Sequence, residues 1–144
     1  MNISEIKVSY SNKSKELQII KDSKSSYKIL LACWSKHTIE LQEEFKVLLL
    51  NRRNAVLGIY SLSKGGVSGT IVDVKLVFSV ALKCNASHII IAHNHPSGNL
   101  KASAADKSLT SKIKKGAELL DIKLLDHIII TKDDYYSFAD NCEL

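Results

Sequence analysis

Two histidines spaced two residues apart are the first sign of chemistry in the sequence. His93 and His95 follow an apolar run at residues 88–92, and Pro96 ends that run directly after them. In an extended strand, residues i and i+2 point to the same side, so both imidazoles can converge on one point. Asp106 follows early in the next expected helix, where a tight loop can return its carboxylate to the two histidines.

These three side chains form a donor set that suits zinc. With His93, His95 and Asp106 as ligands, the fourth tetrahedral position stays open for water, as in catalytic zinc sites. Such a water ionises near neutral pH and becomes a nucleophile. The HNH nucleases, whose label the letters of residues 93–95 spell, are disfavoured. Their metal-binding histidine lies on a helix, and the helix expected here contains none.

Hydrolysis also needs a general base one hydrogen bond from the water. Glu43 and Glu44 open an apolar run, and neighbours in a strand face opposite sides, so only one of them can point at the metal. Glu43 shares its face with Phe45, Val47 and Leu49. Strand parity alone does not choose between the two glutamates.

Ser103 has two candidate roles, because it stands three residues before Asp106. Its hydroxyl can donate to a developing oxyanion and so help to polarise a carbonyl. The spacing Ser-x-x-Asp is also a helix-capping signature. The two roles are compatible, since a capping serine would be fixed in place while its helix presents Asp106.

The remaining polar residues are interpreted as structural. His37, His88 and His127 are typical of core histidines with satisfied hydrogen bonds, and Asp126 beside His127 is assigned no function. The net charge is +5. The densest cluster of basic residues consists of Lys107, Lys112, Lys114 and Lys115. This cluster is interpreted as a solvated helix face, with a phosphate-contacting surface as the alternative.

The hydrophobic pattern predicts a three-layer α/β domain with a mixed sheet. Strands are expected at residues 3–10, 17–20, 43–50, 55–62, 88–92, 124–130 and 135–138. Helices are expected from Asp22 or Ser23 to about residue 34, from Asp73 to about residue 84, and over residues 103–120. The 144 residues suit one compact domain.

Composition excludes several classes of protein. Hydrophobic residues make up 45% and charged residues 24%, as in soluble globular proteins, and no apolar run approaches a membrane span. The three cysteines are widely spaced and form no C-x-x-C pair, which argues against a zinc ribbon or a redox pair. A reducing, cytoplasmic location is expected.

The motif His93-x-His95-Pro96-x6-Ser103-x2-Asp106 resembles the JAMM motif of the JAB/MPN metallopeptidases. The string at residues 93–98, His-Asn-His-Pro-Ser-Gly, resembles the RadC branch of that family. Further landmarks of this resemblance stand at residues 43–51, 86–92, 125–130 and 137–138. The resemblance covers residues 41–144, and residues 1–40 are expected to form an N-terminal extension packed on that domain.

The resemblance implies a cytidine-deaminase-like α/β/α fold and a zinc-dependent hydrolase of peptide or isopeptide bonds. It assigns His93, His95 and Asp106 as ligands and Ser103 as the oxyanion donor. The family glutamate stands two residues before a phenylalanine, which selects Glu43. The chain departs from the family at Ala102, where proline is usual, and no glycine occurs in residues 1–57 to form the turns of the DNA-binding region of full-length RadC proteins.

The sequence therefore predicts a zinc metallopeptidase or isopeptidase that acts on an unidentified peptide, isopeptide or other amide. The alternative is a non-catalytic accessory module, associated with DNA repair, that uses its basic surface. No membrane partner is expected, nucleic acid has weak support, and a homo-oligomer stays open.

Overall fold

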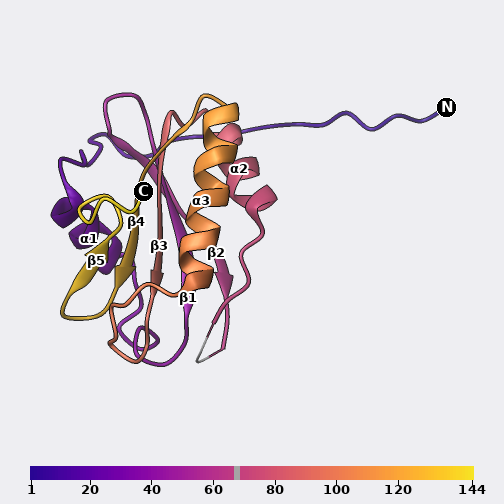
Figure 1. The fold of residues 1–144 in the computed structure, drawn as a ribbon. Coiled ribbons are helices and arrows are strands. Elements are labelled where there is room, and N and C mark those ends of the chain that lie inside the picture. The colour runs from indigo at the N-terminus through magenta and orange to yellow at the C-terminus, as the bar shows by residue number, and fades with distance from the viewer. Residues whose placement is uncertain (67–68) are drawn as a thin grey trace.

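A computed structural model describes residues 1–66 and 69–144 as a five-stranded sheet with helices on both faces (Figure 1). The helices are α1 (Ser23–Ala32), α2 (Val74–Lys83) and α3 (Ala104–Leu119). The strands are β1 (Glu44–Leu50), β2 (Val56–Lys64), β3 (His88–Asn94), β4 (Lys123–Ile130) and β5 (Tyr135–Ser137). Within the described residues, no helix has the length and apolar character to cross a membrane.

The sheet is mixed, with the strand order β2-β1-β3-β4-β5. The β1–β2 hairpin and the β1–β3 and β4–β5 pairs are antiparallel, whereas β3 and β4 are parallel. A parallel pair needs a crossover connection. The α3 helix supplies it, and the loop before α3 therefore leaves the carboxyl end of β3, where the histidines lie.

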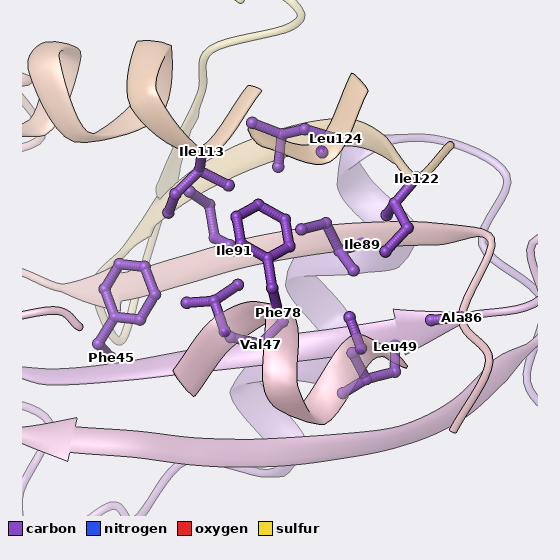
Figure 2. Close-up of a cluster of buried hydrophobic side chains, with 13 residues drawn as sticks. Phe45, Val47, Leu49, Phe78, Ala86, Ile89, Ile91, Ile113, Ile122 and Leu124 are labelled. Carbon is purple, nitrogen blue, oxygen red and sulfur yellow. The ribbon is translucent and has the colours of Figure 1, made fainter. Parts of the chain in front are cut away.

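Two apolar cores make the three layers. The buried residues of β1 alternate between the two faces of the sheet: Val47 and Leu49 pack with α2 and α3, and Leu48 and Leu50 pack with α1. Figure 2 shows the first of these cores, in which side chains from both helices meet the sheet. The α/β fold with a mixed sheet expected from the sequence is confirmed.

Short polar side chains begin all three helices. Asp22, Asp73 and Ser103 are the N-cap residues, and each accepts a hydrogen bond from a backbone N–H of the first turn. The choice between Asp22 and Ser23 for the first cap is thereby settled. That helix ends at Ala32, slightly before the expected residue 34.

The predicted strand at residues 3–10 is wrong. These residues have no regular structure and are exposed, with Ile3 at 80% and Ile6 at 86% relative exposure. A strand needs a neighbouring strand to bond its backbone, and among the described residues no backbone–backbone bond joins residues 3–10 to the sheet. The Tyr10 hydroxyl donates to the Leu57 carbonyl at 2.6 Å. The segment leads away from the domain (Figure 1).

The segment before α1 also differs from its prediction, because residues 17–20 form a single bridge, between Ile19 and Ala55. From there the chain joins the domain, since Ile20, Leu30 and Trp34 are buried in the core beneath α1. The division of the chain at residue 40 stays a prediction.

Candidate metal centre

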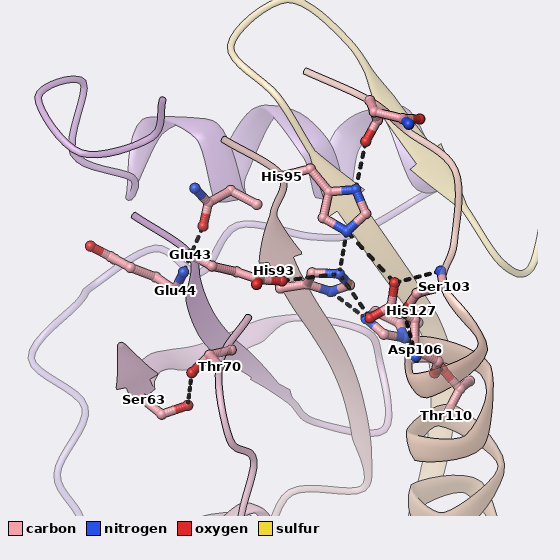
Figure 3. A network of polar contacts seen from close by, with 12 residues as sticks. Glu43, Glu44, Ser63, Thr70, His93, His95, Ser103, Asp106, Thr110 and His127 are labelled. Carbon is pink, nitrogen blue, oxygen red and sulfur yellow. Dashed lines mark hydrogen bonds and ion pairs between the residues drawn. The ribbon is translucent and has the colours of Figure 1, made fainter. Parts of the chain in front are cut away.

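Three elements bring the candidate site together at one edge of the sheet. His93 lies near the end of β3, and its antiparallel partner on β1 is Phe45, so Glu43 lies close to His95 just beyond the paired residues. Asp106 lies in the first turn of α3. Figure 3 shows the two imidazoles and the Asp106 carboxylate facing one another, with Glu43 beside them.

The polar atoms of these side chains are close enough to share one ion. The two histidine Nε2 atoms are 3.0 Å apart. The Asp106 carboxylate reaches both, with Oδ1 at 3.2 Å from His93 Nε2 and Oδ2 at 3.6 Å from His95 Nε2. Glu43 Oε1 lies 3.8 Å from His93 Nε2, and one ligand atom each from Glu43, His93 and His95 fall within 4.8 Å of one another.

This geometry fits a tetrahedral zinc ion. Ligands at zinc's usual bond lengths are about 3.3 Å from each other along the edges of a tetrahedron, and the three contacts among His93, His95 and Asp106 span 3.0–3.6 Å. The His95 Nδ1 atom lies 2.5 Å from the Asn99 carbonyl oxygen. Because a carbonyl only accepts, Nδ1 carries the hydrogen in the neutral ring and Nε2 presents a lone pair.

The two glutamates lie on opposite faces of the sheet. Glu43 faces the histidines, and burial raises the pKa of its carboxyl, an effect that the neighbouring His93 and His95 reduce. Glu44 faces α1, where its carboxylate pairs with Lys46 at 3.2 Å and accepts from Thr38 at 3.1 Å. Glu43 is thus the one that lies beside the candidate ligands.

Ser103 and Asp106 cap α3 reciprocally. Ser103 Oγ accepts from the Asp106 backbone N–H at 3.0 Å, and Asp106 Oδ2 accepts from the Ser103 backbone N–H at 2.8 Å. The capping role of Ser103 is confirmed. Burial alone would raise the pKa of Asp106, but hydrogen bonds with His93 and His95 outweigh it and hold that pKa well below its usual range.

Sequence reasoning missed Asn94, which is fully buried between the two histidines. Its Oδ1 accepts from the Glu44 backbone N–H at 2.7 Å, and its Nδ2 donates to the carbonyls of Ile39 and Gln42 at 2.7 and 2.9 Å. These bonds fasten the segment that carries Glu43 to β3. A buried-type strand that ends in an amide is the only sign of this in the sequence.

His127 was interpreted as structural, yet its ring contacts the site. It is fully buried, and its Nε2 lies 2.8 Å from His93 Nδ1. Burial lowers the pKa of His127 well below its usual value. Asp126 does not pair with this ring, since its carboxylate accepts from the backbone of His127 and Ala139 and from Ser137. His88 lies apart from the site and contacts Asn54.

The comparison with known families decides where this chain belongs. The model of the RadC-like JAB domain matches residues 20–143. The chain belongs to the RadC-like JAB domain family. The match includes α1, so the helix beneath the sheet falls inside the region that the family model covers.

Proteins similar to this chain occur in several bacteria. A UPF0758 protein of Flavobacterium johnsoniae is 57% identical over 98 residues, which is 68% of this chain and 43% of the relative. A UPF0758 protein of Porphyromonas gingivalis is 45% identical over 123 residues, 84% of this chain and 52% of the relative. The chain thus spans about half the length of these curated relatives.

Proposed function

We propose that this RadC-like JAB domain is a zinc-dependent hydrolase that cleaves a peptide, isopeptide or related amide bond. The observation that carries the proposal is the convergence of His93 Nε2, His95 Nε2 and the Asp106 carboxylate within 3.0–3.6 Å, with a further carboxylate at their side. Such a set of neutral nitrogens and an oxyanion, with one position open, is typical of catalytic zinc sites.

Each side chain has a role that follows from its position. His93, His95 and Asp106 would hold the zinc ion, which supplies an activated water and polarises the amide carbonyl. Glu43 takes the proton of the attacking water at its carboxylate and passes it to the leaving amine. The buried environment that raises the Glu43 pKa brings its proton affinity closer to that of the groups it serves.

Ser103 is proposed as the donor to the developing oxyanion. Its Oγ uses a lone pair to cap α3, so the hydroxyl hydrogen remains for another acceptor. Ser103 lines the same cavity as Glu43, His95 and Asp106. A carbonyl oxygen that enters this cavity therefore has a donor on the α3 side.

The test compares the two neighbouring glutamates. Glu43→Gln keeps the shape but removes the proton acceptor, so zinc binding is retained while amide hydrolysis falls by about 100- to 10,000-fold. Glu44→Gln is the matched control, because it weakens the Lys46 ion pair on the other face and leaves hydrolysis intact. Elemental analysis and a peptide-library cleavage assay measure both properties. A folded wild-type protein that never retains zinc would contradict the proposal.

A DNA-binding accessory module is the second candidate function. Lys112 and Lys115 are exposed on α3, whereas Lys107 pairs with Glu143 at 3.3 Å and Lys114 donates to the Leu144 carbonyl at 3.1 Å. Half of the basic cluster is therefore already engaged. Salt-dependent DNA binding that survives His93→Ala would support this function, and absence of binding at low salt would reject it.

A further inference from the structure

Two buried polar residues lie behind His93 and have no role in the proposed chemistry. His127 is 0% exposed and Thr110 is 2% exposed. His93 Nδ1 contacts His127 Nε2 at 2.8 Å, and His127 Nδ1 contacts Thr110 Oγ1 at 2.6 Å. The three side chains form a continuous chain of hydrogen bonds from β3 through β4 to α3, visible in Figure 3.

The far end of this chain fixes where the hydrogens lie. Thr110 Oγ1 donates its only hydrogen to the main-chain carbonyl of Asp106 at 2.7 Å, because a carbonyl cannot donate. Thr110 Oγ1 must therefore accept from His127 Nδ1. A neutral imidazole carries one N–H, so His127 Nε2 accepts from His93 Nδ1. The lone pair of His93 is then on Nε2, which faces His95 and Asp106.

The surroundings of His127 keep its ring neutral and oriented. Phe138 stacks on it with ring centroids 4.6 Å apart, and Phe45 meets it edge-on at 6.1 Å. Burial against these two rings keeps water away from the His127 imidazole, so its hydrogen-bond partners are the His93 and Thr110 side chains. A neutral ring accepts a hydrogen bond at one nitrogen and donates at the other, so it does not donate from both nitrogens.

We propose that His127 and Thr110 are positioning residues that hold His93 as the Nδ1–H tautomer and so present its Nε2 lone pair to the cation. The Thr110 hydroxyl also bonds the main chain of Asp106, so one side chain steadies two of the three candidate ligands. This inference rests on the zinc site of the proposed function and is independent of the substrate. Partners of metal-binding histidines typically contribute about 10- to 100-fold to metal affinity.

Zinc affinity, measured by competition with a chromophoric chelator, tests the role of this hydrogen-bonded chain of His93, His127 and Thr110. Thr110→Val keeps the shape and removes the hydroxyl, and we expect zinc to bind about 10- to 100-fold more weakly. Ser111→Ala, an exposed change on the same helix, is the control and leaves the affinity unchanged. An unchanged affinity in Thr110→Val overturns the proposal.

Two substitutions at His127 separate hydrogen bonding from packing. His127→Phe fills the aromatic pocket but cannot accept from His93, so zinc affinity falls. His127→Gln places an amide oxygen where Nε2 was, so it restores most of the affinity. Equal affinities in the two variants overturn the role of the hydrogen bond, even if both are less stable than the wild type.

Nitrogen-15 spectra of the zinc-loaded wild type show which ring nitrogen of His127 carries the hydrogen, and so the direction of the hydrogen bonds. We expect His127 to carry its hydrogen on Nδ1, and a hydrogen on Nε2 overturns the inference. If the variants change zinc affinity as expected but the protein cleaves no amide, the positioning role of His127 and Thr110 holds and the proposed hydrolase is wrong. If the protein cleaves an amide but Thr110→Val leaves its zinc affinity unchanged, the proposed hydrolase holds and the positioning role is wrong.

Discussion

At the scale of single residues, His95 differs from His93 in its exposure and its partners. The side chain of His95 is 17% exposed and that of His93 is 3% exposed. Burial alone would lower the pKa of His95, but the nearby Asp106 carboxylate and the hydrogen bond to the Asn99 carbonyl outweigh that effect and raise the pKa. In the metal-free protein, a proton on His95 therefore competes with the cation for the same lone pair.

This competition predicts an opposite pH response in the metal-free and the zinc-loaded protein. The pKa of His95 is raised on folding, so its stabilising contribution is present below about pH 6.5 and is lost as pH rises through the folded value. Thermal unfolding followed by circular dichroism should show the metal-free protein losing stability as the pH rises above about 6.5 and passes the raised pKa of His95, whereas the apparent zinc affinity increases.

The control for this prediction is His95→Ala, in which the loss of stability over that range disappears. His88→Ala offers a second comparison. Burial and the nearby Lys123 and Arg52 lower the pKa of His88, so its contribution has the opposite sign. Identical pH profiles for the wild type and His95→Ala would show that His95 is not the group that titrates.

At the scale of secondary-structure elements, the first turn of α3 combines a helix cap with a candidate ligand. Asp106 accepts the Ser103 N–H with Oδ2 and faces His93 with Oδ1. The helix N-terminus favours a negative charge there. The cap thus fixes the carboxylate before any ion binds, and the same serine serves both helix stability and the chemistry proposed above.

Three substitutions of Ser103 separate these two contributions. Ser103→Ala should lower the free energy of unfolding by about 1 kcal/mol through loss of the cap and also reduce hydrolysis. Ser103→Asp restores the cap but its carboxylate has no hydrogen to donate, so stability returns while hydrolysis stays about 100-fold or more below wild type. Ser103→Thr keeps both properties. Full activity in Ser103→Asp would leave the serine with the capping role alone.

At the scale of the whole molecule, local patterns predicted the elements near the site well. The alternation in β1, the caps Asp73 and Ser103, and the two-residue spacing of His93 and His95 are all local signals. Local patterns could not predict features that depend on contacts between residues far apart in the sequence. Strand parity did not separate Glu43 from Glu44, because the choice depends on which helices cover which face. His127 contacts His93 across β3 and β4, and no spacing in the sequence reports that contact.

In the N-terminal segment, a local pattern predicted a strand that the structure does not contain. Residues 3–10 alternate in polarity as a strand does, but within the described part of the chain they pair with no strand of the sheet. Intrinsic preference for a strand is weak until a neighbouring strand supplies hydrogen bonds. The segment therefore contributes little to stability. In contrast, α1, whose start was predicted from its capping residue, packs on one face of the sheet.

Unfolding measurements can separate these two N-terminal parts. Leu30 is fully buried between α1 and the sheet, so Leu30→Ala should lower the free energy of unfolding by about 2–5 kcal/mol. Zinc affinity of the folded protein should stay unchanged, because the ligands lie on the other face. Deleting residues 2–12 removes mainly the Tyr10 hydrogen bond at an exposed site, and we expect a loss below about 1 kcal/mol. A deletion that destabilises as strongly as Leu30→Ala would show that the segment packs on the domain in solution.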